Sequence, residues 1–180
     1  AQVGDELGSR IIAARLVERF MRLCFLMERR YAPYSKWFGS AFQRLNCASD
    51  LSPLLEQILA APNYPAREPA LAQVYTRLAE MHNALGVTPP LETRTRTYSG
   101  WHSLRAGVDN LPLDDPGNTR PHQVIFAGRF VDALLAEIQD PAVRSFVQAA
   151  GSVSQFLVES SDALQNVAFC RRLIDDLQEA

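Results

Sequence analysis

The sequence of 180 residues has little cysteine, little lysine and no long apolar run. Apolar runs such as Leu23–Met27 are far shorter than the roughly 20 residues that a membrane helix needs, so we expect no membrane partner. The chain does not open with the regions of a signal peptide. Its three cysteines, Cys24, Cys47 and Cys170, form no CxxC pair, which indicates reduced thiols rather than a disulfide framework or a zinc site. We therefore expect a cytoplasmic protein.

An excess of one charge is also lacking. The formal net charge of -2 gives no global attraction to a polyanion, so a nucleic-acid partner is not expected and a nucleotide would need a local basic patch. Hydrophobic residues at 47% and charged residues at 21% are typical of a globular protein, and the length suits one domain over residues 1–180. Because the first residue is Ala1 rather than methionine, we also expect the C-terminal part of a longer chain.

Apolar residues recur at steps of three and four along most of the chain, which predicts an all-α bundle of about six to eight helices. The first helix is expected from Asp5 to about Tyr31, and the fourth to end at Gly86. The apolar face of the first helix would carry Ile12, Leu16, Phe20, Leu23, Met27 and Tyr31. Later helices are expected to begin near Ser35, Ser52-Pro53, Pro69, Ala127 and Asp140-Pro141, with further helical turns over about 153–177.

One long irregular connection is expected over about residues 87–122, where prolines and glycine interrupt any helical period. Within it, Thr93–Thr97 alternates with period two and is expected to be extended. Such long connections are usually functional or mobile. Its basic and aromatic residues fit either a lid or docking loop or an insertion that packs its own aromatic side chains: Arg94, Arg96, Tyr98, Trp101, His102 and Arg105.

The most unusual stretch lies at the junction of the first two expected helices, where Lys36 is the only lysine of the chain. Arginine suits phosphate geometry and aromatic rings can stack on a base, so one interpretation is a surface for a nucleotide or acceptor substrate. In the other, the arginines compensate the helix end, Tyr31 and Trp37 fill the core, and Glu28 pairs with an arginine. The candidate binding residues are Arg29, Arg30, Tyr31, Tyr34, Lys36 and Trp37.

A stripe of Arg15, Arg19 and Arg22 follows the first helix, with Glu18 placed to pair with Arg22. Such a stripe is typical of a solvated helix face, where each pair contributes only a few tenths of a kcal/mol. The alternative is a docking face for another domain.

Three blocks carry a family resemblance: the start Gly4–Ser9, the run from Arg22 to Phe42, and Met81–Gly86. Together they resemble the bacterial domain-of-unknown-function family 4037, which is similar to the helical C-terminal part of nucleotidyltransferases. The resemblance implies an accessory, non-catalytic domain that positions substrate or stabilises an N-terminal nucleotidyltransferase module of the same chain. In such a module a Gly-Ser pair is followed by two acidic residues that bind divalent metal, and no Gly-Ser pair of this chain is followed by them. Mg²⁺ and the nucleotide would therefore bind to the missing module, and we expect no cofactor in this domain.

Two alternatives stay open. Arg77 and His82 have the spacing of metal-independent ribonucleases of the HEPN type, which would need both side chains on an exposed surface. Arg96 and His102 fit that spacing equally well, so the signal is weak. The third reading is an oligomerisation module, for instance a homodimer. His82, His102 and His122 lack the spacing of a metal site, so no metal is expected.

Overall fold

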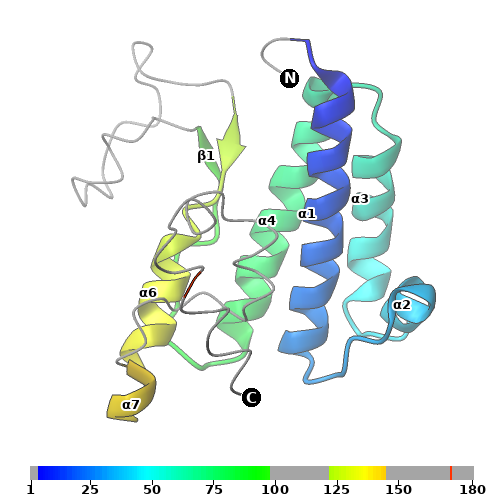
Figure 1. Ribbon diagram of the computed structural model, residues 1–180. Coiled ribbons are helices and arrows are strands. Elements are labelled where there is room, and N and C mark those ends of the chain that lie inside the picture. Colours follow the sequence, from blue (N-terminus) through cyan, green and yellow to red (C-terminus); the bar gives the residue numbers. More distant parts are fainter. Residues whose placement is uncertain (1–3, 98–121, 145–170, 172–180) are drawn as a thin grey trace. The chain divides into compact units, whose positions relative to one another are not determined.

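The computed structural model describes residues 4–97, 122–144 and 171 (Figure 1). The chain divides into two compact units, residues 1–133 and 134–180. Within the described ranges the secondary structure is helical except for one pair of short strands, so the broad all-α class is confirmed. The expected count of six to eight helices is not confirmed, and the single domain stays a prediction.

Three helices of the first unit lie side by side: α1 (Glu6–Met27), α3 (Ala48–Ala60) and α4 (Tyr64–Ala84) (Figure 1). Each of the three packs on the other two, and their facing side chains form the hydrophobic core. The shorter helix α2 (Ser35–Phe42) is fixed to α1 through aromatic contacts, because the ring of Phe25 lies 5.4 Å from Phe38 and 6.4 Å from Phe42. No helix in the described ranges is long and apolar enough to span a membrane.

The buried face of α1 differs from the predicted one. Phe20 and Met27 are buried as expected, but Ile12 and Leu23 are exposed. The core instead receives a row that includes small residues, which lets α3 and α4 approach the helix closely: Ala13, Val17, Phe20, Cys24 and Met27. Two overlapping stripes on α1 have the spacing of an apolar face, and the contacts with α3 and α4 decide which one is buried.

The ends of several helices were predicted wrongly. Helix α1 ends at Met27 rather than near Tyr31, and α2 includes Ser35 as its first residue rather than as its cap. Gly86 does take the left-handed conformation after α4, with φ of 63°, as a helix-ending glycine should. Helix α7 (Pro141–Arg144), in the second unit, begins at the predicted proline. The helical turns expected over 153–177 lie outside the described residues, apart from Arg171.

Helix α4 begins five residues before the predicted start at Pro69. Asn63 is its N-cap, and the Oδ1 atom of Asn63 accepts a hydrogen bond from the N–H of Ala66 at 3.0 Å. Pro65 lies in the first turn, where its missing N–H needs no partner. An asparagine cap followed closely by a proline favours a helix start, so Asn63-Tyr64-Pro65, which was predicted to be a turn, begins the helix. Pro69 consequently lies inside the helix.

The buried guanidinium of Arg67 joins all three long helices. Ile58 lies in the last turn of α3, and Pro62, four residues later, has no N–H to donate to its carbonyl. Ala61 is the extended C-cap of α3, so its carbonyl lies outside the helical hydrogen bonds. Arg67 donates to both, its Nε to Ile58 O at 3.1 Å and its Nη2 to Ala61 O at 3.2 Å.

The same guanidinium also reaches the start of α1. The Nη1 atom of Arg67 donates to Ser9 Oγ and its Nη2 to Glu6 Oε1, each at 2.7 Å. The hydrogen bond from Arg67 is the leading reason that the pKa of Glu6 lies below its ordinary value. Arg67 is thus an arginine that ties the start of α1 to the end of α3.

The chain after α4 is held to that helix by side chains. Asn83 bonds twice to the backbone of Leu91, donating to its carbonyl at 2.7 Å and accepting from its N–H at 3.0 Å. Strand β1 (Arg96–Thr97) pairs antiparallel with β2 (Gln123–Val124), which confirms extended chain at the end of Thr93–Thr97. The helix that follows, α6 (Gly128–Ala136), matches the expected start near Ala127.

Candidate functional site at the α1–α2 corner

Helix α1 ends in a Schellman motif. The N–H of Arg30 donates to the carbonyl of Phe25 at 2.8 Å, and the N–H of Arg29 donates to that of Leu26 at 3.0 Å. The motif places Arg29 at the position where glycine is usual, and its φ is 53°. Among the described residues Arg29 is the only one other than glycine with a positive φ. Its backbone therefore has a conformation that is unfavourable for a residue with a side chain.

Glu28 fixes the corner to the start of α3. Its carboxylate accepts hydrogen bonds from the N–H groups of Asn46 and Cys47, both at 2.9 Å. Partial burial opposes ionisation of this carboxyl, but the two backbone N–H donors outweigh it, and the pKa of Glu28 lies below its ordinary value. Because Glu28 satisfies N–H groups at the helix start, α3 begins at Ala48 rather than at the predicted Ser52-Pro53, and Pro53 lies inside it.

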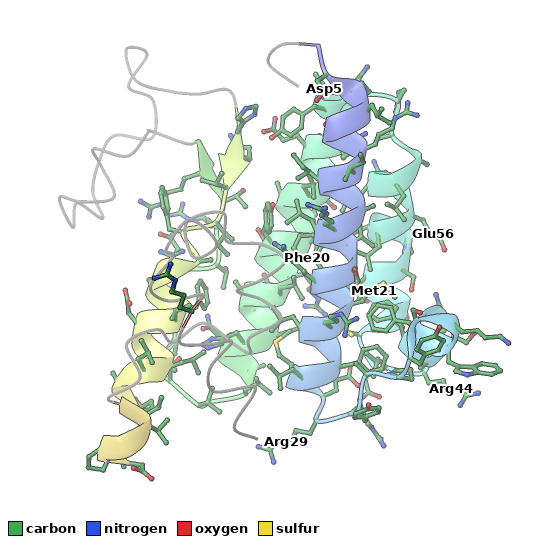
Figure 2. The ribbon with its side chains drawn as sticks, viewed as in Figure 1. Asp5, Phe20, Met21, Arg29, Arg44 and Glu56 are labelled. Atoms are coloured by element: carbon green, nitrogen blue, oxygen red, sulfur yellow. The ribbon has the colours of Figure 1, made fainter. Side chains whose placement is uncertain are left out.

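All six candidate binding residues are exposed, and we call them the corner surface: Arg29, Arg30, Tyr31, Tyr34, Lys36 and Trp37. The three aromatic side chains are open to solvent, with exposed fractions of 91% for Tyr31, 75% for Tyr34 and 60% for Trp37. The expectation that Tyr31 and Trp37 fill the core is therefore wrong. Lys36 holds its Nζ 5.4 Å from the centroid of the Trp37 ring. Figure 2 shows Arg29 and Arg44 at the end of the helices opposite Asp5.

The corner surface offers two kinds of contact. Its exposed rings can stack on a planar group, and its three cations can bind phosphate or carboxylate oxygens. It contains no acidic residue, and the neighbouring carboxylate of Glu28 already accepts two backbone hydrogen bonds. The arrangement therefore suits recognition of an anionic, ring-bearing molecule and supplies no group for metal-assisted chemistry.

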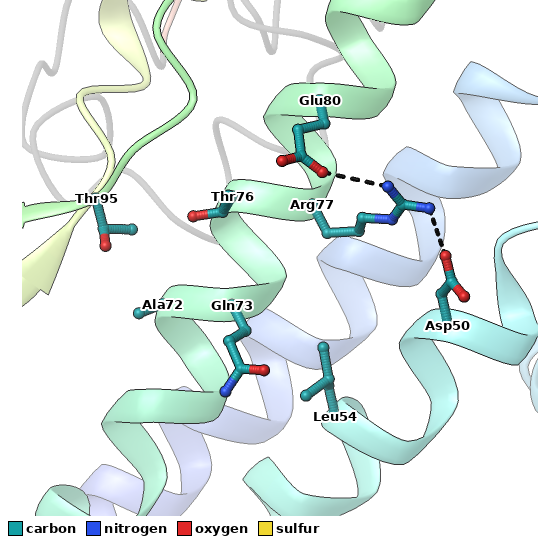
Figure 3. A pocket seen from close by; sticks show the side chains of 8 residues that line it. All are labelled: Asp50, Leu54, Ala72, Gln73, Thr76, Arg77, Glu80 and Thr95. Atoms are coloured by element: carbon teal, nitrogen blue, oxygen red, sulfur yellow. Dashed lines mark hydrogen bonds and ion pairs between the residues drawn. The ribbon is translucent and has the colours of Figure 1, made fainter.

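Arg77 lies on α4 beside a cavity of about 480 Å³ (Figure 3). Its guanidinium forms ion pairs with Asp50 of α3 and with Glu80, and the hydrogen bond with Asp50 is the leading cause of the raised pKa of Arg77. The cavity is lined by Asp50, Leu54, Ala72, Gln73, Thr76, Arg77, Glu80 and Thr95. Arg77 is thus held by two carboxylates at an exposed site.

His82 lies elsewhere on α4 and does not line that cavity. Both ring nitrogens of His82 are buried without a hydrogen-bond partner, and its ring centroid lies 5.0 Å from that of Phe130. The ribonuclease hypothesis requires Arg77 and His82 together on an exposed surface, so the geometry does not favour it. Cleavage of a labelled RNA would be its test. In the alternative pair, Arg96 bonds to Glu92, while His102 lies outside the described residues.

Other candidates give no metal centre in the part of the chain that the structure describes. No three His, Cys, Asp or Glu side chains there are grouped as metal ligands would be. The ring of His122 packs against that of Tyr64 at 4.7 Å. Of the residues expected in the irregular connection, Arg94 bonds to Glu92, and the others beyond Thr97 lie outside the described ranges: Tyr98, Trp101, His102 and Arg105.

The family model of a domain of unknown function, DUF4037, matches residues 1–38. The match supports the resemblance to that family and covers α1 and the whole corner surface. No curated protein and no solved structure matches the chain. The relation to nucleotidyltransferases is not part of the match.

Proposed function

We propose that the helical unit is an accessory domain of a nucleotidyltransferase, not catalytic alone, and that the corner surface positions the nucleotide or acceptor substrate. The observation that carries the proposal is the exposure of Tyr31, Tyr34 and Trp37 beside three cations. Large aromatic side chains are usually at least half buried, and an exposed cluster marks a place that another molecule covers.

The conformation of Arg29 supports a binding role for its side chain. A residue other than glycine in the left-handed region costs about 1–2 kcal/mol. A glycine would satisfy the Schellman motif without this cost. The sequence keeps an arginine, which is explained if its guanidinium contacts a phosphate of the ligand.

The direct experiment uses the fluorescence of Trp37 in the chain of 180 residues. The chain has two tryptophans, so Trp101→Phe leaves Trp37 as the reporter within it. We expect ATP to change this fluorescence in a saturable way. The double variant Arg30→Ala/Lys36→Ala should weaken ATP binding at least about tenfold, because charge-assisted hydrogen bonds contribute about 1.5–3 kcal/mol each. A matched double variant of exposed arginines outside the corner, Arg15→Ala/Arg77→Ala, should bind ATP normally.

Unchanged ATP affinity in Arg30→Ala/Lys36→Ala would remove the nucleotide-positioning proposal. If ATP leaves the Trp37 signal of the 180-residue chain unaltered and a separately added nucleotidyltransferase module changes it, the corner surface contacts that module instead of the substrate.

Substitution of Arg29 by glycine separates stability from binding. Arg29→Gly should raise the free energy of unfolding by about 1 kcal/mol, because the left-handed strain is relieved, while ATP binding weakens. The reverse change, Gly86→Ala, should lower the free energy of unfolding by a similar amount, because Gly86 has a φ of 63°. A stabilised Arg29→Gly protein that binds ATP normally would show that the Arg29 side chain is not used.

A further inference from the structure

The outer face of α1, which points away from α3 and α4, carries five large apolar side chains with exposed fractions between 41% and 74%. At 100° per residue these positions fall within about half of the helix circumference. The set, which we call the outer face, consists of Leu7, Ile11, Ile12, Leu23 and Leu26. Single exposed apolar residues are normal, but five on one helix form a surface that a partner is expected to cover.

Positive charge lies among these apolar residues. The same half of α1 carries three arginines, Arg15, Arg19 and Arg22, and one acidic residue between them, Glu18. Glu18 is already engaged, since its Oε1 accepts from the Nε and Nη2 of Arg22 at 3.0 and 2.9 Å. The outer face is therefore apolar with a net positive charge, and the complementary partner is apolar with acidic residues.

The charge pattern distinguishes this partner from a second copy of the chain. In a dimer with two-fold symmetry the same patch faces itself, so the arginines of one copy would meet those of the other. Like charges in contact disfavour such pairing. The charge of the outer face thus selects a partner of opposite sign.

The same pattern also disfavours a lipid surface. A membrane-bound helix keeps its apolar residues together on one side and its basic residues on the other. Around the helix axis, Arg15 and Arg22 lie between Ile11 and Leu26. Insertion of these two apolar side chains into a membrane would therefore bring guanidinium groups toward the hydrocarbon. A protein partner can place a carboxylate against Arg15 and avoid this cost.

We propose that the outer face of α1 docks an amphipathic helix whose apolar stripe is flanked by acidic residues. The face extends from Leu7 to Leu26, about 28 Å at 1.5 Å per residue, which is about five turns of the docked helix. Side chains at steps of three and four, such as Leu7 with Ile11 and Leu23 with Leu26, form the ridges into which a second helix packs. This partner goes beyond the proposed role of the corner surface and does not depend on it.

The test uses two synthetic helical peptides of 22 residues, the length of α1. Both carry leucines on one face; glutamates flank the leucines in one peptide and lysines in the other. Fluorescence anisotropy of labelled peptide, titrated with the full chain, gives the two dissociation constants. We expect the glutamate peptide to bind at least about tenfold more tightly than the lysine peptide, with an affinity that falls as salt is added.

Variants locate the binding on α1. Leu26→Glu should weaken the glutamate peptide about tenfold or more, because it places a carboxylate in the apolar surface. Leu59→Glu is the matched control, since Leu59 is an exposed leucine on α3 outside the outer face, and it should leave binding unchanged. Arg15→Glu should reduce the preference between the peptides. Circular dichroism verifies that each variant is folded.

Several outcomes would overturn the proposal. They are equal affinity for both peptides, absence of binding at millimolar peptide, and equal weakening by Leu26→Glu and Leu59→Glu. Cosedimentation with vesicles of phosphatidylserine and phosphatidylcholine, without peptide binding, would assign the outer face to a membrane instead. Self-association that Leu26→Glu abolishes, without a peptide preference, would assign it to a second copy. ATP binding at the corner surface is measured separately, so failure here leaves the proposed function in place.

Discussion

Replacement of Arg67 by methionine tests whether the buried guanidinium holds the three long helices together. Only 1% of the Arg67 side chain is exposed, and its donors supply hydrogen bonds to two carbonyls at the end of α3, those of Ile58 and Ala61. Methionine retains much of the volume of the side chain but donates nothing. The variant therefore buries the carbonyls of Ile58 and Ala61 without a partner.

The expected loss follows from these two carbonyls. A buried polar group left without its partner costs about 1–3 kcal/mol, so two of them cost about 2–6 kcal/mol. Glu6 adds little, because its carboxylate is partly exposed and water can solvate it in the variant. We expect Arg67→Met to lower the free energy of unfolding by about 4 kcal/mol. Urea denaturation followed by far-UV circular dichroism measures it, and an unchanged m-value confirms that the unfolding transition is comparable.

The matched control lies on the same helix. Arg77 makes two ion pairs at the surface, where such pairs contribute about 0–1 kcal/mol, so Arg77→Met should lose less than about 1 kcal/mol. If Arg67→Met and Arg77→Met lose the same free energy, or if Arg67→Met unfolds like wild type, the role given to the buried guanidinium of Arg67 is refuted.

Two further predictions concern groups near the corner. Glu28→Ala removes the acceptor for the N–H groups of Asn46 and Cys47 and should lower the free energy of unfolding by about 1 kcal/mol. Because the pKa of Glu28 is lowered from 4.5 in the folded state, this difference from wild type should be full above pH 4.5 and shrink as the pH falls below it, which urea midpoints against pH would show. Burial raises the pKa of Cys24 to about 11, so in a Cys47→Ser/Cys170→Ser protein, where Cys24 is the remaining thiol, its thiolate fraction at pH 8 is about 0.1%, and labelling by a thiol reagent should be slow until urea unfolds the chain. Fast labelling of Cys24 in the folded protein, or a Glu28→Ala difference that persists at pH 2, would contradict these assignments.

The helical class was predictable because its signal is repeated over many residues. Leu71, Val74 and Leu78 mark α4 by their spacing, and all three are buried. The start of α3 was not predictable in this way, since the two N–H groups just before it, those of Asn46 and Cys47, are satisfied by Glu28, which lies 18 and 19 positions earlier. A boundary set by a contact between distant residues leaves no mark in the local sequence.

The corner surface was identified by its composition, but its exposure was not predictable. Tyr31 continues the step of four from Met27, so periodicity places it on the buried face of α1. The Schellman motif turns the chain at Arg29 and takes Tyr31 off the helix. The arginine stripe of the outer face was identified as a possible docking face, but its apolar residues were missed, because Ile12 and Leu23 have core spacing and only the packing of α3 and α4 leaves them exposed. Pro62, placed four residues after Ile58, was the one local signal that a carbonyl at the end of α3 needs another donor.

The buried Arg67 also bears on the order of folding. Its bonds to Ser9 and Glu6 join positions 58 and 61 residues apart, so they form only after the start of α1 has met α4. Because the entropy of closing such a loop is lost before the contact stabilises the chain, we expect these bonds to form late, and their loss then accelerates unfolding more than it slows folding. Arg67 would accordingly affect the unfolding rate of the assembled helices more than their folding rate.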